Sequence, residues 1–425
     1  MKSKIEKELL PHPRQGFAYF IWAICLIFNF YLYLVQFSAW GATSERLVGS
    51  SFPSLGVGRL LLSYNVAVII FQFPIALLID KFGPRRMTSL VILVCAIGVL
   101  ILSFSGSAGE FWWGAFLMGL GGTVTTVNIL KIVSNWFHPR KFTLLLAWTF
   151  FALIIGAMVG QWLTHQLTHN FDWSKVMFNY GLIGILYAII FFVCVRDSAV
   201  GISYKIVPPP RHFNLSKSVK KALKKGENYA LAIGCALAFS QWFSFYGVWH
   251  LRYFKASYIH ESPDTIWMNL YPMIGFAIGM VGFLYLGYYT KRRKVYMLFG
   301  TAVALILSIC TLYIPNLPFG LHVTLDFVAA ISVGSMALAY AMIHEKNIPA
   351  ITATVVGMIV FFLAVFRLLG EVFILTILGS FGDNPATFSV ADYQSALIVL
   401  PFSLLFALIA LVFVKENHGE QVYEE

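Results

Sequence analysis

The strongest constraint in this sequence is a series of twelve apolar runs, each about as long as the roughly 20 residues that a helix needs to cross a bilayer. Only 12% of the 425 residues are charged, against about 25% in soluble domains. We therefore predict an all-α membrane protein with twelve transmembrane helices. The runs cover approximately residues 17–40, 58–79, 87–105, 112–135, 143–166, 174–195, 229–253, 265–289, 295–313, 319–343, 351–378 and 393–414.

Basic residues are unequally distributed between the two sides of these runs. Twelve crossings place both termini on one side, and most of the 30 Lys and Arg residues lie in the intervals of that side. The opposite side carries only Arg46, Arg59, Lys175, Arg252 and Lys255. Because positively charged loops remain in the cytoplasm, both termini are predicted to be cytoplasmic. The compact chain with short tails favours a bacterial inner (plasma) membrane.

The longest polar interval, residues 196–227, separates six runs from six. We predict an N-terminal six-helix bundle over 1–195, a basic cytoplasmic linker over 196–227 and a C-terminal bundle over 228–425. Basic turns at 79–86 and 287–294 occupy the same place in each half, as in a duplicated, pseudo-symmetric unit. The linker lysines are either a short amphipathic helix against an anionic leaflet or a solvated charge run. They are Lys217, Lys220, Lys221, Lys224 and Lys225.

Two intervals resemble loops of the major facilitator superfamily. The stretch Asp80-Lys81-Phe82-Gly83-Pro84-Arg85-Arg86 is similar to its signature G-x-x-x-D-R/K-x-G-x-R-R/K, with Ala76 in place of the first glycine. The stretch Asn135-Trp136-Phe137-His138-Pro139-Arg140-Lys141 is similar to the W-F-P-x-x-R turn of many members that carry organic anions. The resemblance implies a conformational latch made by Asp80, Gly83, Arg85 and Arg86, in which the acid ties the second helix to the start of the eleventh. We expect Arg85 or Arg86 to stabilise the Asp80 carboxylate.

Few ionisable side chains lie inside the apolar runs, where each costs about 2.5 to 3.5 kcal/mol and therefore suggests a function. Arg367 and Glu371 are four residues apart, so they share one helix face. An anion at Arg367 would free Glu371 to take a proton; a purely structural ion pair is the alternative. Asp326 is a second proton-carrying candidate or a helix-packing acceptor. Lys131 either assists substrate binding or extends to the interface.

Polar and aromatic residues elsewhere in the runs could line one cavity, although each alone is more often a packing group. With Arg367 and Lys131, the predicted substrate-binding set contains Asn128, Tyr33, Gln36, Tyr64, Gln161, Gln241, Tyr246 and Asn269. Gly247, among aromatic residues, would let the seventh helix bend in its outer half.

Several classes are disfavoured by what the sequence lacks. It has no Walker loop, no H-E-x-x-H and no nucleophile elbow, and its five cysteines show no metal-binding spacing. We expect no enzyme activity, no cofactor, no metal and no nucleic acid partner, and a monomer in the lipid bilayer. The resulting hypothesis is a secondary active transporter, symporter or antiporter, that moves a small organic anion by alternating access, with optional proton coupling. The alternatives are an efflux transporter of drug-like or amphipathic compounds and a substrate-sensing receptor that does not transport.

Overall fold

A computed structural model describes residues 15–46, 56–197, 214–258, 265–382 and 388–422. Twelve helical segments in this part are long and apolar enough to cross a membrane, which confirms the twelve predicted runs. The first six are α2 (Gln15–Arg46), α3 (Gly56–Phe82), α4 (Pro84–Phe104), α5 (Ala108–Trp136), α6 (Pro139–Asn170) and α7 (Trp173–Cys194).

The second six segments are interrupted more often. The seventh is built from α9 (Gly226–Ser244), the π-helical turn η1 (Phe245–Trp249) and α10 (His250–Ser257), and the eighth and ninth are α11 (Thr265–Thr290) and α12 (Lys294–Tyr313). The tenth contains α13 (Phe319–Val333), η2 (Gly334–Ala337) and α14 (Leu338–Glu345). The last two are η3 (Pro349–Ile351) with α15 (Thr352–Phe381), and α16 (Val390–Leu397) with α17 (Val399–Val412).

Local sequence explains where several helices begin. Gly83 has φ +89° and is followed by Pro84 in the first turn of α4, a place where proline loses no hydrogen bond. Ser107 and Glu110 form a reciprocal capping box at the start of α5. Pro139 likewise opens α6. These signals fix short turns between long helices, so consecutive helices run antiparallel.

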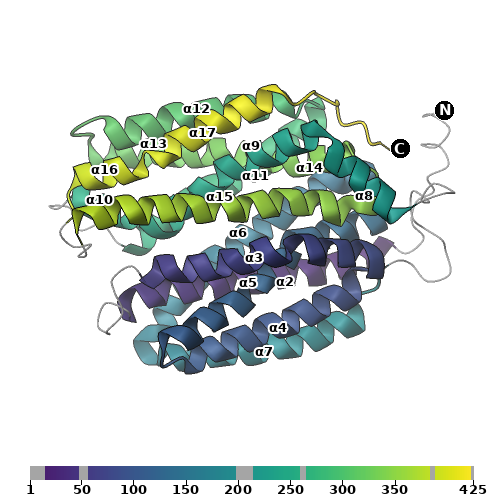
Figure 1. Cartoon of the computed structure of the whole chain (residues 1–425), viewed down its shortest axis with the longest axis horizontal. Coiled ribbons are helices and arrows are strands. Elements are labelled where there is room, and N and C mark those ends of the chain that lie inside the picture. Colours follow the sequence, from purple (N-terminus) through teal and green to yellow (C-terminus); the bar gives the residue numbers. More distant parts are fainter. Residues whose placement is uncertain (1–14, 47–55, 198–213, 259–264, 383–387, 423–425) are drawn as a thin grey trace.

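The helices form two bundles of six, seen one above the other in Figure 1. In the first bundle α2 packs on α6, and α4 packs on α5 and α7; in the second, α9 packs on α15 and α17, and α11 and α12 pack on α13. The bundles meet mainly along α3 with α15 and α6 with α11. The predicted division at 196–227 stays a prediction, since residues 198–213 lie outside the described part.

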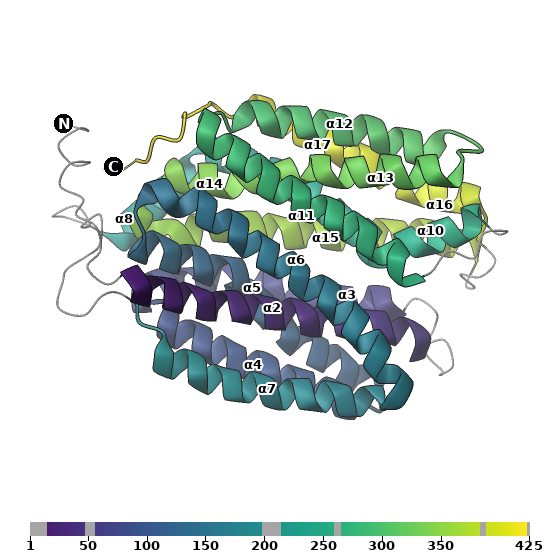
Figure 2. The same cartoon turned by 180° about the vertical axis from the view of Figure 1, so that it is seen from behind.

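The start of α2, the short helix α8 (Leu215–Lys224) and the chain after α17 all lie at one end of the molecule (Figures 1 and 2). This placement fits an even number of crossings. The distribution of basic loops predicts that this end is cytoplasmic, and we refer to it below as the terminal end.

Candidate functional site

The acid of the signature loop joins the two bundles at the terminal end. Asp80 ends α3, and its carboxylate accepts hydrogen bonds from the backbone N–H groups of Ala353 (3.3 Å) and Thr354 (2.8 Å) and from the Thr354 hydroxyl (2.7 Å). These N–H groups lie in the first turn of α15, where helix donors lack intrahelical partners and favour negative charge. The structure thus brings Asp80 to the start of the eleventh span, as the resemblance implied; its action as a latch stays a prediction.

The counter-charge of Asp80 is Lys131, which corrects two expectations. The Lys131 ammonium lies 2.7 Å from the Asp80 carboxylate, with side chains 7% and 0% exposed, and also donates to the Ala350 carbonyl at 2.7 Å. Lys131 is absent from the described lining of the central cavity presented below, because α5 directs it to the bundle interface at the terminal end. Arg85 and Arg86 were expected to stabilise Asp80, but the helix packing gives this role to Lys131.

Arg85 instead holds the loop to the end of the first bundle. Its backbone N–H donates to the Asp197 carboxylate at 2.7 Å, and its guanidinium donates to the Phe192 carbonyl at 2.7 Å. A Cβ added to Gly83 would lie 2.5 Å from the Asp197 carboxyl carbon. Gly83 is therefore required both by its positive φ and by the close approach of Asp197. Burial raises the pKa of Asp197, and the Arg85 N–H and the nearby Arg side chains oppose that shift.

The departure from the signature at Ala76 does not separate the helices. Ala76 is fully buried in α3, and a Cβ added to Gly357 of α15 would lie 3.0 Å from the Ala76 methyl group. The small residue that permits close packing is thus on α15 rather than α3. Beyond this contact, Phe142 of α6 stacks on His344 of α14 with ring centroids 3.8 Å apart, so aromatic packing also joins the bundles at the terminal end.

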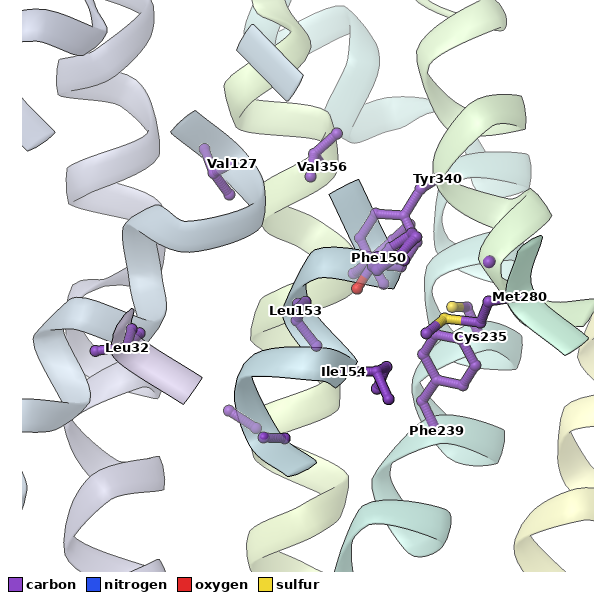
Figure 3. Close-up of a cluster of buried hydrophobic side chains, with 14 of the residues drawn as sticks. Leu32, Val127, Phe150, Leu153, Ile154, Cys235, Phe239, Met280, Tyr340 and Val356 are labelled. Carbon is purple, nitrogen blue, oxygen red and sulfur yellow. The ribbon is translucent and has the colours of Figure 1, made fainter. Parts of the chain in front are cut away.

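A central cavity lies between the two bundles. It is lined by Tyr33 of α2, Tyr64 of α3, Thr126 of α5 and Arg367 of α15, among others. Eight of the twenty lining residues are aromatic, and Figure 3 shows Phe150 of α6 beside Tyr340 of α14, with their rings 5.2 Å apart. The other lining residues are Gln36, Phe37, Asn65, Val68, Gly122, Thr125, Phe150, Leu153, Phe239, Phe243, Phe276, Met280, Tyr340, Val360, Leu363 and Ala364.

The cavity brings together only part of the predicted substrate-binding set. Tyr33, Gln36, Tyr64 and Arg367 line it, and the Tyr64 hydroxyl lies 3.5 Å from the Gln36 side-chain oxygen. Arg367 is 4% exposed and is the one basic residue among the described lining residues. A buried guanidinium among phenol and amide groups is suited to bind a carboxylate or another oxyanion.

Other members of the predicted set have packing positions instead. The Asn128 amide contacts the Cys25 sulfur at 3.8 Å between α5 and α2, and Gln161 contacts the Met273 sulfur at 3.9 Å between the bundles. Gln241 donates to the Phe366 carbonyl at 3.1 Å. These contacts place the three side chains between helices rather than in the central cavity. The side chain of Asn269 lies outside the described residues.

Glu371 is completely buried on the same helix as Arg367, one turn further along α15. Its carboxylate accepts a hydrogen bond from the Trp249 indole N–H at 3.2 Å. The Arg252 guanidinium lies over the Trp249 ring, 5.2 Å from its centroid. Glu371 is absent from the described lining residues of the central cavity, whereas Arg367 is among them.

Asp326 of α13 lies at the centre of a buried network that the sequence only partly indicated. Its carboxylate is 3.1 Å from the His250 side-chain nitrogen, 3.2 Å from the Tyr271 hydroxyl and 3.6 Å from the His322 side-chain nitrogen. The Tyr258 hydroxyl lies 3.0 Å from the other His322 nitrogen. Asp326, Tyr246 and Gln241 also line a second cavity, inside the second bundle. Every partner named here can exchange a proton with its neighbour.

The π-helical turn η1 connects the two acids. Trp249 ends this turn and contacts Glu371, whereas the next residue, His250, contacts Asp326. A π-turn inserts one extra residue into a helix and frequently occurs at functional sites. The predicted bend at Gly247 falls inside it, and the insertion directs adjacent side chains to different helices.

Sequence reasoning missed several residues that belong to these sites. His322 is four residues before Asp326, a spacing that places both on one helix face and that could have been recognised. Trp249 and Tyr271 carried no comparable signal. Phe243 and Phe276, two aromatic residues of the cavity wall, also carried no sequence signal, since most aromatic residues in such helices face lipid or neighbouring helices.

Comparison with known proteins identifies the family. Residues 20–371 match the Major Facilitator Superfamily, and the chain belongs to that family. The chain is therefore an integral, multi-pass membrane protein, and this membership agrees with the prediction that it is not an enzyme.

Individual relatives are more distant. The chain is 25% identical over 166 residues to the probable galactarate/D-glucarate transporter GudP of Escherichia coli, covering 37% of this chain and 36% of that protein. It is 27% identical over 124 residues to the multidrug resistance protein MdtH of Salmonella arizonae, 28% of each chain. Each match thus spans well under half of the relative. The crystal structure of the human organic anion transporter MFSD10 (TETRAN) has a TM-score of 0.65 at 14% identity, covering 94% of this chain and 100% of that one, and so has a similar fold.

Proposed function

We propose that the protein transports a small organic anion by alternating access, with Arg367 as the main anion contact. The observation that carries this proposal is the buried Arg367 guanidinium in the wall of the central cavity between the bundles. A guanidinium forms strong, charge-assisted hydrogen bonds with a carboxylate or another oxyanion. An oxyanion in the cavity would contact Arg367 in this way, and Tyr33, Gln36 and Tyr64 would hydrogen-bond its remaining oxygens.

The name of GudP supports an acidic sugar or related carboxylate as the substrate class. The two contacts at the terminal end, Asp80 with α15 and Phe142 with His344, favour a conformation in which this end is closed. In the proposed cycle these contacts break so that the cavity opens to the terminal end. Lys131 belongs to that step, because it neutralises Asp80.

We further propose that Asp326 or Glu371 carries a coupling proton. His322 and Tyr258 extend from Asp326 along α13 and α10 toward the end opposite the terminal end. A proton entering there would pass from Tyr258 to His322, whose second side-chain nitrogen lies 3.6 Å from the Asp326 carboxylate. The consecutive residues Trp249 and His250 then link the two acids, because Trp249 donates to Glu371 and His250 contacts Asp326.

The aromatic wall supports the alternative of drug-like substrates. Phe150, Phe239, Phe243, Phe276 and Tyr340 would adapt to hydrophobic compounds, and the name of MdtH includes multidrug resistance. Anion dependence distinguishes the two hypotheses. A receptor that does not transport would bind the same ligand without accumulating it in vesicles.

The test is thermal stabilisation of the purified protein by a panel of sugar acids, other carboxylates, neutral sugars and cationic drugs, because a ligand that binds only the native state raises Tm. We expect a sugar acid to stabilise the wild type, and Arg367→Gln to lose that shift. Asn128→Ala, a buried polar change away from the cavity, should retain it. Stabilisation by cationic drugs alone, equal in wild type and Arg367→Gln, would instead support the efflux alternative.

A further inference from the structure

The helix α8 presents a basic face that no described side chain neutralises. Lys217, Lys220, Lys221 and Lys224 are all exposed, and α8 contains no acidic residue. At about 100° per residue these four side chains fall within roughly one quarter to one third of the helix circumference. We call Lys217, Lys220, Lys221 and Lys224 the basic face. No ion pair to these four ammonium groups is found within the described residues.

The opposite face of α8 is attached to the protein. Ser218, Val219 and Ala222 are buried, and α8 packs against α9 and against η3. The following residue, Lys225, donates to the Lys346 carbonyl at 3.1 Å. This helix is therefore docked on the protein, and its lysines are exposed on the opposite side. A freely solvated charge run would have no buried face.

The surface that α8 covers is the closed terminal end. Asn228, at the start of α9, and Asn347, before η3, exchange side-chain hydrogen bonds of 3.1 and 3.0 Å. Lys346 forms an ion pair with Glu227 at 2.7 Å. The turn η3 begins with Pro349, and the carbonyls of Pro349 and Ala350 accept hydrogen bonds from Lys131. The short segment from Lys346 to Ala350 thus links the position of α8 to the position of the Asp80 contact.

We propose that the basic face of α8 binds anionic lipid headgroups of the adjacent leaflet and that this binding stabilises the closed terminal end. A multi-pass protein has the bilayer surface next to its interfacial helices, and clustered lysines on such a helix bind anionic lipid. The attraction is electrostatic and falls off within a Debye length, so salt weakens it. The inference does not rest on the proposed substrate, and its experiments use none.

The first experiment measures lipid binding to the full chain in neutral detergent. Phosphatidylglycerol or phosphatidylcholine is added, and Tm is followed. We expect only phosphatidylglycerol to raise Tm, with the half-maximal concentration about tenfold to a hundredfold higher in Lys217→Gln/Lys220→Gln/Lys224→Gln, as loss of up to three lysine contacts implies. High salt should remove the shift in the wild type.

The matched control removes equal charge from the same end of the molecule. Lys291, Arg292 and Lys415 are exposed outside α8, and Lys291→Gln/Arg292→Gln/Lys415→Gln should respond to phosphatidylglycerol like the wild type. Equal losses in both triple variants would refute a specific α8 site and leave only the orienting role of basic loops. Full stabilisation by glycerol phosphate would also overturn the proposal, because the site would then bind free phosphate rather than a lipid surface.

The second experiment measures closure directly. Spin labels at exposed Arg140, at the start of α6, and Thr290, at the end of α11, report the distance between the bundles at the terminal end. The five native cysteines are replaced for this purpose. In nanodiscs we expect phosphatidylglycerol to increase the short-distance population of the wild type and of the control triple variant, and to leave the α8 triple variant unchanged. An unchanged distribution in the wild type would overturn the regulatory part of the proposal.

Discussion

Asp80 and Asp326 are both buried carboxylates, yet their surroundings differ in kind. Asp80 is held by two backbone N–H groups, a hydroxyl and the Lys131 ammonium. Asp326 is surrounded by His250, His322 and Tyr271. The first environment consists of hydrogen-bond donors and a cation, which stabilise a carboxylate; the second consists of side chains that can both donate and accept a hydrogen bond. Burial alone therefore does not distinguish a structural acid from a proton carrier, whereas the chemistry of the partners does.

The largest effect is expected for Asp80→Asn, which would leave the Lys131 ammonium buried without a counter-charge. Breaking a buried pair in this way costs about 3 to 5 kcal/mol. Tm and the Arg140 to Thr290 spin-label distance provide the measurement, and both should show a less stable, more open terminal end. The double variant Asp80→Asn/Lys131→Met should recover part of the loss. If Asp80→Asn were as stable as the wild type, Asp80 and Asp326 would not differ as described.

A smaller loss of stability is expected for Asp326→Asn, about 1 to 3 kcal/mol, because its partners are two histidines and a tyrosine rather than a fixed ammonium group, and mainly hydrogen bonds are altered. Its functional effect should be specific. Uptake driven by a pH gradient should stop in proteoliposomes, while substrate exchange at equal pH continues, since exchange needs no net proton movement. Loss of both activities would assign Asp326 to substrate binding or folding and would remove the contrast between Asp326 and Asp80.

Gly83→Ala should cost about 1 to 2 kcal/mol, within the range for a side chain forced into the positive-φ, extended-ψ region that glycine alone adopts readily, plus the displacement of Asp197. Unfolding in detergent measures the change. Gly106→Ala is the matched control, because Gly106 also precedes a helix but a Cβ there meets nothing within 4 Å; it should stay within about 0.5 kcal/mol of the wild type. Equal losses would mean that Gly83 is not specially constrained.

The smallest effect concerns Asp197, whose pKa is raised by burial although the Arg85 N–H opposes the shift. The folded state then holds its proton more tightly than the unfolded state. Stability relative to Asp197→Asn should therefore fall as pH rises from about 4, the ordinary pKa of Asp, through the raised value, and stay constant above it. A relative stability that rises over this range would show that the arginines dominate over burial.

The sequence predicted the twelve spans and the loop acid because both are local patterns. A membrane helix must satisfy its own backbone, so a long apolar run suffices to identify it. The resemblance implied the contact of Asp80 with the start of α15, but the ion pair with Lys131 was not predictable, since Lys131 reaches Asp80 only through the packing of α5 on α3 and α15. The Asp326 network was likewise predictable only in part. His322 lies on the same helix face as Asp326, whereas His250 belongs to another helix and directly follows a π-turn that has no sequence signature.

The Ala76 contact has a consequence for how related sequences should vary. Ala76 and Gly357 share one limited volume where α3 and α15 cross, so we expect substitutions at the two positions to be coupled. Relatives with glycine at position 76 should tolerate alanine at 357, and the combination of two larger residues should be avoided. In an alignment of related sequences, positions 76 and 357 should then covary, and this covariation would reflect the crossing of the two bundles.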